Sequence, residues 1–363
     1  MANILHLSTA KSWRGGEQQI ANLVQELSKK EINQLIVCPY GAPLEKWCNT
    51  NNHPCYNFKK RFGLDPLFAW RVYKTSKAFK AEIVHAHDAQ AHTTAVFNSF
   101  FLLAKPIIVI NRRVIFPIKN SFFTKFKYNY YKVKKIICVS RAVQKVVVEI
   151  VPENNTTVIP SSVKLSKTED LKPGLLKEEL HISSDTKIIG TVAALTSEKG
   201  INTFLDTAKL LLEKEEAFHF VIIGKGKLLD KLKFKANLLN IDKKVSFLGF
   251  RNNVKELLLD LDLLLFTSKS EGLGTSLLEA CEMNVPIVAF STGGIPEIIT
   301  HKETGYLVQD YSSAEFANAV NELLHNSTLR ETIIKQAKSG LTAFSTSKMA
   351  ESTLNVYHHL LGI

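Results

Sequence analysis

Two carboxylates frame a glycine-rich loop in the second half of the chain. The run Ser268–Ala280 follows the apolar stretch Leu263–Phe266 directly, and Glu271 and Glu279 lie eight residues apart within it. The two glycines between them keep side chains out of the loop, so backbone amides can approach hydroxyl or phosphate oxygens. If a helix begins near Thr275, Glu279 lies about one turn inside it and Glu271 stays in the loop. The spacing therefore predicts that both carboxylates can point at one ligand.

A second candidate lies near the N-terminus, where Trp13-Arg14-Gly15-Gly16-Glu17 follows the apolar run Asn3–Leu7. A glycine pair that opens a helix lets the backbone approach a ligand and directs amides toward an anion. Taken alone, the pair is equally compatible with a plain strand-to-helix turn. His87, after another apolar run, is interpreted as functional, whereas His85 and His92 are interpreted as structural histidines.

The elements that position these residues alternate between short apolar strands and helical stretches. Such alternation predicts parallel sheets with crossover helices, whose ligands bind beyond the carboxyl ends of the strands. In the first half, strands are expected at 3–7, 34–37, 83–85, 107–110, 136–139 and 157–159, with helical stretches at about 17–30 and 67–80. The first series predicts one doubly wound domain.

A second series follows the charged, proline-containing stretch Lys164–Lys172, which has the low apolar content of a linker. Strands are expected at 187–192, 219–223, 245–247, 263–266 and 287–289, and a long amphipathic segment closes the chain at 346–361. The predicted domains are residues 1–165, residues 166–345, and a C-terminal helix, 346–363, that packs back on the first domain. No short-period repeat is present in either series.

Composition agrees with a folded chain of two domains, since 363 residues exceed what one compact core usually holds. The first residues lack the apolar core and cleavage site of a secretory signal, and no apolar stretch reaches the ~18 residues of a membrane-spanning helix. The five cysteines are scattered and form no Cys-x-x-Cys pair, which argues against a disulfide framework or a structural zinc site. We therefore expect a cytoplasmic protein with reduced thiols.

The positive charge is concentrated in one segment. Eleven basic residues and no acidic residue lie between Lys105 and Lys145, interleaved with seven aromatic rings: Phe116, Phe122, Phe123, Phe126, Tyr128, Tyr130 and Tyr131. This mixture suits an anionic membrane surface, which predicts peripheral contact at the inner membrane face through residues 112–135. A solvated basic face whose rings belong to the core is the alternative interpretation, and nucleic acid is not an expected partner.

The chain resembles glycosyltransferase family 4, whose hallmark is two glutamates separated by seven residues with a Glu-Gly-Phe-Gly loop, here Glu271-Gly272-Leu273-Gly274. Further motifs that match in order are Lys199-Gly200, the IIGKG run that includes Gly224, VSFLGF at 245–250, Gly293-Gly294 with Glu297, and Thr304-Gly305. Gly15-Gly16, His85-Ala86-His87 and the Cys138–Ser140 segment resemble the family more loosely. The resemblance implies an α/β fold of two Rossmann-like domains facing across a cleft (GT-B), with the C-terminal helix crossing back to the N-terminal domain.

The resemblance also implies roles for particular residues. Lys199 would stabilise the diphosphate leaving group, Glu271 would hold the donor sugar, and His87 would lie near the anomeric centre; these are the expected catalytic residues. The expected donor and nucleotide contacts are Gly15, Gly16, Gly224, Phe250, Arg251, Gly272, Leu273, Gly274, Thr275 and Glu279, the last on the ribose hydroxyls. The expected substrates are a nucleotide diphosphate sugar and a glycan or lipid-linked acceptor of bacterial polysaccharide or lipopolysaccharide synthesis, with no cofactor.

The chain departs from the family pattern at two places, and in the first of them Ser161-Ser162 follows Pro160 where the family usually has Asn-Gly. The second is an absent arginine. The family commonly has an arginine five or six residues before the catalytic lysine, where this chain has Ala193 and Ala194; Arg14 or Lys225 are candidates to replace its charge. Transfer is expected to retain anomeric configuration, the leaving phosphate accepting the acceptor's proton, and to need no metal. Asp260-Leu261-Asp262 resembles a metal motif but enters an apolar strand, so no metal site is expected there.

Three other functional classes are alternatives to a glycosyltransferase. A non-catalytic subunit could keep this fold, and nucleotide-sugar epimerases and phosphorylases use similar paired domains. A phosphorylase usually needs a pyridoxal cofactor, and epimerases lack the Glu-x7-Glu context. The sequence identifies neither the donor sugar and base nor the acceptor or the oligomeric state.

Overall fold

The computed structural model describes residues 2–63, 65–100, 106–119, 121–165, 171–214 and 217–363. The chain forms two compact units, which are described separately: unit 1 comprises residues 1–164 and 344–363, and unit 2 comprises residues 165–343. Residues 166–170, the centre of the expected linker, lie outside the described part of the chain.

Unit 1 is built on a parallel sheet in the order β3-β2-β1-β4-β5-β6-β7. Its strands are β1 (Ala2–Leu7), β2 (Ile32–Pro39), β3 (Cys55–Phe58), β4 (Ile83–Ala86), β5 (Ile107–Arg112), β6 (Val133–Cys138) and β7 (Thr156–Val158). Its helices are α1 (Gly15–Leu27), α2 (Pro43–Thr50), α3 (Pro66–Ala78), α4 (Ala89–Phe100), α5 (Phe122–Tyr128), α6 (Arg141–Val148) and α14 (Thr346–Leu361). The strand order reverses beside β1, so the ends of β1 and β4 lie at the switch point where ligands bind in such sheets.

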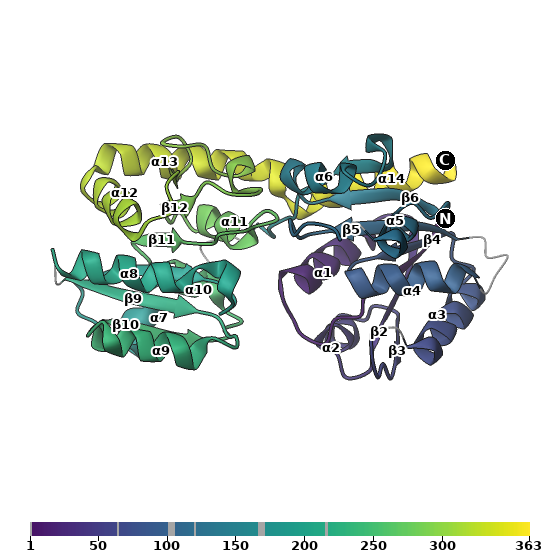
Figure 1. Ribbon diagram of the computed structural model, residues 1–363, viewed down its shortest axis with the longest axis horizontal. Helices are drawn as coiled ribbons and strands as arrows, with labels where there is room; N and C mark the ends of the chain where they lie inside the picture. The colour runs from purple at the N-terminus through teal and green to yellow at the C-terminus, as the bar shows by residue number, and fades with distance from the viewer. Residues whose placement is uncertain (1, 64, 101–105, 120, 166–170, 215–216) are drawn as a thin grey trace. The chain divides into compact units, whose positions relative to one another are not determined.

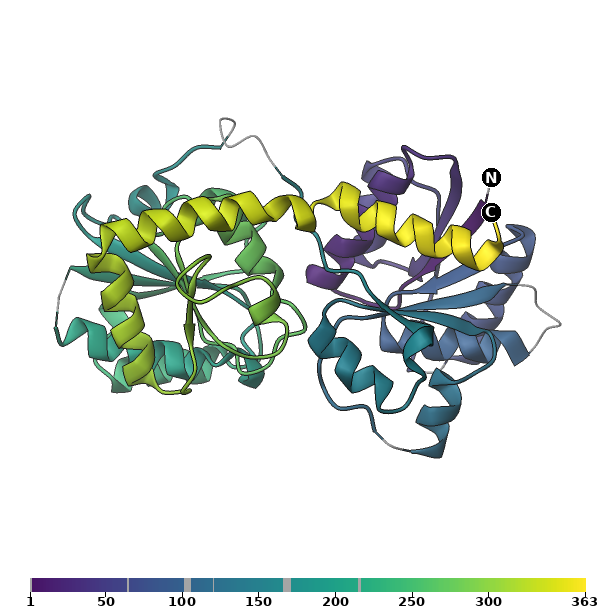
Figure 2. The same cartoon turned by 90° about the horizontal axis from the view of Figure 1, so that it is seen from above.

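The C-terminal helix belongs to unit 1, as the sequence predicted. α14, yellow in Figures 1 and 2, shares one apolar core with α1 and with the buried faces of β1, β4, β5 and β6. The phenol of Tyr357 is fully buried there, and its oxygen lies 2.5 Å from Nδ1 of His85 on β4. This contact joins residues 272 positions apart in sequence, so the end of the chain completes the core of its first half.

Unit 2 repeats the arrangement with a parallel sheet in the order β10-β9-β8-β11-β12-β13. Its strands are β8 (Lys187–Val192), β9 (Phe218–Ile223), β10 (Val245–Gly249), β11 (Leu263–Phe266), β12 (Ile287–Phe290) and β13 (Tyr306–Val308). Its helices are α7 (Leu175–Glu179), α8 (Ile201–Leu212), α9 (Leu229–Leu238), α10 (Val254–Leu258), α11 (Thr275–Glu282), α12 (Ser313–His325) and α13 (Ser327–Gly340). The two-sheet α/β class expected from the sequence is confirmed.

Two strands were missing from the sequence interpretation. β3 and β13 are edge strands of four and three residues. An edge strand is covered on fewer sides than a central one, so its sequence lacks the continuous apolar run by which central strands are recognised. The predicted helix 17–30 also ends earlier, because α1 stops at Leu27 and is followed by a turn.

In the described part of the chain, no helix combines the length and the apolarity that crossing a bilayer requires.

Candidate functional site

The main group of candidate site residues lies at the carboxyl edge of the sheet in unit 2. Lys199 follows β8 in a short 3-10 turn, Ser197–Lys199, and Glu271 lies in the loop after β11; the ammonium of Lys199 donates to Oε1 of Glu271. The Glu271 side chain is only 9% exposed, so the carboxylate is desolvated and depends on the lysine for compensation. The two residues expected to be catalytic in this unit are therefore neighbours.

Two glycines allow the loops around this pair to pack closely. Gly200 has a φ of +64°, and a Cβ at this position would lie 2.0 Å from the carbonyl oxygen of Thr267. Gly293 has a φ of +57°, and its Cβ would lie 2.0 Å from the carbonyl oxygen of Glu271, which also accepts the amide of Gly294. A side chain at Gly200 would push the Lys199 and Glu271 loops apart, and a side chain at Gly293 would push the Glu271 loop away from the loop after β12.

Glu279 lies in the second turn of α11, whose first residue is Thr275, as the spacing predicted. Burial raises the pKa of its carboxyl group to about 7; Lys255 nearby lowers the pKa and Glu282 raises it. Lys255 forms an ion pair of 2.6 Å with Glu282, so much of its charge is engaged by that carboxylate. Glu279 is thus a half-buried carboxylate whose ionisation falls near neutral pH.

The remaining predicted donor contacts of unit 2 divide into two groups. Gly272, Leu273 and Gly274 are buried in the loop between Glu271 and α11. Gly224 follows β9 and donates its amide to Gly249 at the end of β10, which is followed by the half-exposed ring of Phe250. Arg251 is different, because its guanidinium forms an ion pair with Glu179 of α7 and would have to exchange that partner to contact a donor.

Lys225 lies next to Ala193 and Ala194, the segment in which the family commonly has an arginine. The amide of Leu195, in the segment that contains Ala193 and Ala194, donates to the carbonyl of Lys225. The ammonium of Lys225 lies 5.0 Å above the ring of Phe250 and its side chain is exposed. Of the two residues considered for this charge, Lys225 lies in the same unit and beside the same loop, whereas Arg14 lies at the start of α1 in unit 1.

The Asp-Leu-Asp tripeptide has a structural role in this unit. Oδ2 of Asp262 accepts the amide of Ile188 at 2.7 Å, and the carboxylate of Asp260 accepts the amides of Gly174 and Leu176. Both side chains therefore fix backbone at the start of β8 and of α7.

In unit 1, His87 lies directly after β4 and is only 4% exposed. Its Nδ1 accepts from Nδ2 of Asn111 at 3.1 Å and lies 3.4 Å from a guanidinium nitrogen of Arg113. Because neither partner group can accept a proton, the ring proton must be on Nε2, which lies 3.0 Å from Nδ1 of His6. The chain of hydrogen bonds ends on Oε1 of Gln34, 3.2 Å from Nε2 of His6. Both ring nitrogens of His87 are thus occupied by protein, so it offers no free N–H to a substrate, contrary to the sequence interpretation.

Burial keeps these imidazoles neutral. It is the largest cause that holds the pKa of His87 and His85 well below 6.5, with neighbouring rings adding to the effect, and it lowers the pKa of His6 to about 4. The ring nitrogens of His6, His85 and His87 lie within 4.8 Å of one another, a spacing that a metal ion could bridge. The hydrogen bonds argue against this use, since the Nε2 atom of His87 carries the proton that a metal would have to replace.

Gly15 and Gly16 form the first turn of α1, as expected. The carboxylate of Glu17, in the same turn, accepts the amide of Arg14 at 2.9 Å. Sequence reasoning missed Arg113, which follows β5: one of its guanidinium nitrogens would lie 3.9 Å from a Cβ on Gly16 and donates to the carbonyl of His87 at 3.0 Å. The signal in the sequence was an arginine directly after a predicted strand. The sequence interpretation counted Arg113 only as one charge of the basic segment between Lys105 and Lys145.

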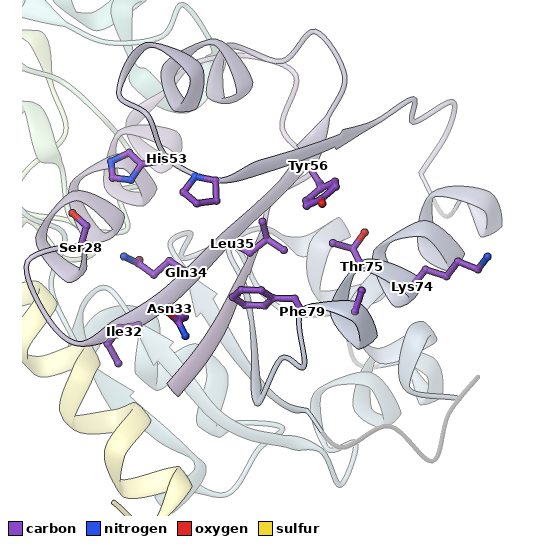
Figure 3. A pocket seen from close by; sticks show the side chains of 12 residues that line it. Ser28, Ile32, Asn33, Gln34, Leu35, His53, Tyr56, Lys74, Thr75 and Phe79 are labelled. Carbon is purple, nitrogen blue, oxygen red and sulfur yellow. The ribbon is translucent and has the colours of Figure 1, made fainter. Parts of the chain in front are cut away.

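A sizeable pocket of unit 1 lies elsewhere. This open pocket of about 800 Å³ is formed near the start of β2, the segment before β3 and the end of α3, and Figure 3 shows Gln34, His53, Tyr56 and Phe79 around it. It contains none of the predicted site residues. Nearby, Cys38 and Cys55 bring their Sγ atoms within 3.6 Å, so these cysteines are not scattered in space.

The basic aromatic segment contains both surface and core residues. Phe122 is 87% exposed and Tyr131 is 66% exposed, whereas Tyr128 and Tyr130 are buried, so the latter two belong to the core. Lys119, Lys125 and Lys134 are exposed, but Lys132 is buried. The surface that remains, which we call the α5 surface, consists of Phe116, Lys119, Phe122, Phe123, Lys125, Phe126, Tyr131 and Lys134.

Two family models cover most of the chain. The model of Glycosyltransferase Family 4 matches residues 13–167, and the model of Glycosyl transferases group 1 matches residues 175–340. The first match contains Gly15, Gly16 and His87, and the second contains Lys199, Glu271 and Glu279.

Curated relatives and solved structures agree with the models. The chain is 24% identical over 308 residues to the poly(ribitol-phosphate) alpha-N-acetylglucosaminyltransferase of Staphylococcus aureus, covering 83% of this chain and 59% of that enzyme. It is 23% identical over 324 residues to the UDP-Gal:alpha-D-GlcNAc-diphosphoundecaprenol alpha-1,3-galactosyltransferase of Escherichia coli, covering 82% and 83%. The structure of Anabaena Alr3699/HepE in complex with UDP-glucose superposes with a TM-score of 0.85 at 19% identity, covering 99% of this chain and all of that one.

The two units thus have the Rossmann-like architecture of GT-B proteins, and in unit 2 two residues of the motifs that resemble the family, Lys199 and Glu271, are in contact. The chain spans about three fifths of the length of the staphylococcal relative, so the likeness to it concerns this fold and not that whole protein. With both halves matched by their family models in the right order, the chain belongs to the glycosyltransferases of family 4.

Proposed function

We propose that the protein transfers a sugar from a nucleotide diphosphate sugar to a glycan or lipid-linked acceptor, with retention of anomeric configuration and without a catalytic metal. The observation that carries the proposal is the Lys199–Glu271 pair at the carboxyl edge of unit 2, beside the glycine loop that leads to Glu279. These residues come from the ends of two adjacent strands, β8 and β11, where nucleotides bind in sheets of this kind.

Each member of the pair has a chemical task. The ammonium of Lys199 is the charge that would stabilise the diphosphate as negative charge develops on the leaving group, an effect worth several kcal/mol in a desolvated site. Glu271 orients that ammonium and can accept hydroxyl groups of the donor sugar with its other oxygen. Glu279, when ionised, can accept both ribose hydroxyls.

Retention and independence of metal are supported by the contacts of three acidic residues of unit 2, of which Asp260 and Asp262 precede β11 at the opposite edge of the sheet from Glu271. Asp260 and Asp262 are engaged by backbone amides, and Glu271 is engaged by Lys199. In the proposed reaction the bond from the anomeric carbon to the leaving phosphate breaks, the bond to the acceptor oxygen forms on the same face, and the leaving phosphate takes the acceptor's proton.

The acceptor is proposed from the relatives' names. Poly(ribitol phosphate) and a diphosphoundecaprenol-linked sugar both contain phosphate and are therefore anionic. We propose an acceptor of this class, in the synthesis of bacterial cell-surface polysaccharide or lipopolysaccharide, used at the cytoplasmic face of the membrane.

The α5 surface is the proposed contact with the membrane. Phe122 and Phe123 are exposed large apolar side chains next to exposed lysines, the combination that binds the interface of an anionic bilayer.

Each lysine near such a surface contributes about 1 kcal/mol, so replacing Lys119, Lys125 and Lys134 by glutamine should weaken binding to phosphatidylserine vesicles by about 100-fold. Replacing three exposed lysines of unit 2, Lys231 and Lys233 of α9 and Lys243 shortly after it, is the matched control. Unchanged sedimentation with vesicles after the first replacement would refute the membrane contact.

The first experiment on the reaction itself is a thermal-shift and calorimetric screen against UDP, GDP, ADP and their common sugars, with and without chelator. A response to one nucleotide that persists with chelator is expected, and it would disappear in Glu279→Ala. Absence of any response, in a folded protein, would favour a non-catalytic subunit that has kept this fold.

A further inference from the structure

Three of the five cysteines lie together in unit 1. Cys38 is near the end of β2, Cys48 is in α2, and Cys55 is the first residue of β3. The Sγ atoms of Cys38 and Cys55 lie 3.6 Å apart, and the thiol of Cys48 is hydrogen-bonded to that of Cys55 as well. Cys55 packs against the apolar cluster of α1, β2 and α2 to which the other two belong. It is therefore the central thiol of the group.

The three thiols differ in their access to solvent. Cys38 and Cys48 are completely buried, whereas Cys55 is partly exposed. A small reagent from solvent therefore reaches Cys55 first, and a buried thiol lies beside the product. Hydrogen bonds donated by Cys38 and Cys48 lower the pKa of the Cys55 thiol, against the opposing effect of burial. The thiolate, which is the reactive form of cysteine, is favoured at Cys55.

The other two cysteines provide a contrast within the same chain. Cys138 ends β6 and is completely buried, and Cys281 in α11 is 3% exposed. Burial raises the pKa of both thiols to about 12. Neither thiol is expected to react with an oxidant from solvent, because each is both covered and protonated.

The strand that carries Cys55 can accommodate a new bond. Cys55 lies opposite Ile36 in the register, two positions before Cys38, so both cysteines point to the same face of the sheet. An S–S bond of about 2.05 Å requires the sulfur atoms of this pair to approach by about 1.5 Å. β3 is a four-residue edge strand, so it can shift toward β2 or α2 without breaking a second ladder.

We propose that Cys55 is a peroxide-sensitive thiol whose oxidation ends in a disulfide with one of the two buried thiols beside it. In the first step the Cys55 thiolate attacks one oxygen of hydrogen peroxide, the O–O bond breaks and hydroxide leaves, which oxidises the sulfur to a sulfenic acid. In the second step the thiol of Cys38 or Cys48 attacks this sulfur, the S–S bond forms, the S–O bond breaks and water leaves. One peroxide is reduced to water for each pair of thiols oxidised.

The test uses the full chain with its thiols reduced, and hydrogen peroxide as the probe. The remaining thiols are blocked with a maleimide, and the tryptic peptides are identified by mass spectrometry. Residues 31–46 carry Cys38 in one tryptic peptide, and residues 47–59 carry Cys48 and Cys55 in the next. A bond between Cys55 and Cys38 joins the two peptides, whereas a bond between Cys55 and Cys48 closes a ring within the second. Either product supports the proposal and identifies the partner.

The variants separate Cys55 from the other thiols. The wild type should lose two of its five thiols, and Cys55→Ser should retain its remaining four, because both steps need the Cys55 sulfur. Cys138→Ser is the matched control and should still lose two. Without peroxide, the maleimide should label Cys55 at least about tenfold faster than Cys138 or Cys281. Circular dichroism and thermal unfolding establish that each variant is folded.

Three results would overturn the proposal. The first is a folded wild type that keeps all five thiols after peroxide treatment. The second is a Cys55→Ser variant that loses two thiols as the wild type does. The third is a disulfide between the Cys55 residues of two chains, which a non-reducing gel shows as a dimer. If Cys55→Ser does not fold, the peptide map of the wild type still decides whether Cys55 forms the bond.

Discussion

Unit 1 and unit 2 place their candidate site residues at the same edge of similar parallel sheets, but they control ionisation differently. In unit 2 a lysine and a glutamate, both charged, neutralise each other, and the pKa of Glu279 is raised to about 7. In unit 1 the histidines at the sheet are neutral because burial lowers their pKa, and the charge of Arg113 lies near the carboxylates of Glu17 and Asp88. The comparison indicates that substitutions in unit 2 should change turnover and ligand binding, whereas substitutions in the histidine network of unit 1 should first change stability.

The largest effect is expected in unit 2. Lys199→Ala should lower turnover by about 100-fold, a loss of about 2.7 kcal/mol of transition-state stabilisation, because it removes the cation proposed to act on the leaving group. Steady-state kinetics with circular dichroism would measure this. Lys235→Ala, which breaks the partly exposed ion pair with Asp206, is the control and should retain full activity. Near-normal turnover of Lys199→Ala would remove the lysine from the mechanism.

In unit 1, His87→Ala should reduce the free energy of unfolding by about 2–4 kcal/mol, because it removes one hydrogen-bond partner each from His6, Asn111 and Arg113 in a buried place. Urea denaturation would measure the change. His53→Ala, which removes a half-buried ring stacked on Trp47, should cost about 1 kcal/mol or less. Unchanged stability together with lost turnover would contradict the comparison and return His87 to a direct catalytic role.

The affinity for the donor should depend on pH through Glu279. Its ionised form accepts the ribose hydroxyls, so a pKa of about 7 predicts that nucleotide-sugar affinity rises about tenfold between pH 6 and 8. The opposite sign holds for stability without ligand: because the pKa is raised on folding, the contribution of Glu279 is present at low pH and is lost as pH rises through about 7.

A nucleotide sugar is the right probe for this pH dependence. The terminal phosphate of a free nucleotide has its own pKa of about 6, and its titration would be superimposed on that of Glu279. Calorimetry at several pH values would measure the effect, and Glu279→Gln should flatten it. A flat profile in the wild type would mean that Glu279 is ionised throughout this range or does not contact the donor.

The smallest effect concerns the two units' tyrosines. Tyr357→Phe removes the hydroxyl that contacts Nδ1 of buried His85 and should cost about 1 kcal/mol of stability. Tyr306→Phe in unit 2 removes a hydroxyl that donates to the half-exposed Glu322, and it should cost clearly less because water replaces the lost bond. If the two variants lost the same stability in thermal unfolding, burial would not explain a difference between the two hydrogen bonds.

Much of unit 2 could be predicted because its site is local in sequence. The glutamates belong to one loop and the helix that follows it, so their spacing alone indicated a common ligand, and the family motif supplied the remaining positions. Lys199 lies after a different strand, and its pairing with Glu271 depends on β8 and β11 being neighbours in the sheet. The sequence predicted both residues without revealing that they contact each other.

Unit 1 was less predictable because its network draws on four strands. His6, Gln34, His87 and Asn111 belong to β1, β2, the end of β4 and β5, and no spacing relates them. The same holds for Cys38 and Cys55, which contact each other on neighbouring strands. It also holds for the aromatic segment, where the burial of Tyr128 and Tyr130 and the exposure of Phe122 follow from the packing of a helix whose sequence is aromatic on all sides.

The sequence by itself determined the two alternating series of strands and helices, the closing helix, and the glutamate motif, because each depends on periodicity or spacing within a short stretch of chain. Only the tertiary structure decided that Lys199 is bound by Glu271, that both ring nitrogens of His87 are occupied, and that Arg113 lies beside the first turn of α1. The physical reason is that ionisation and hydrogen bonding depend on burial and on neighbours from distant strands, and these are set by the order of strands in the sheet.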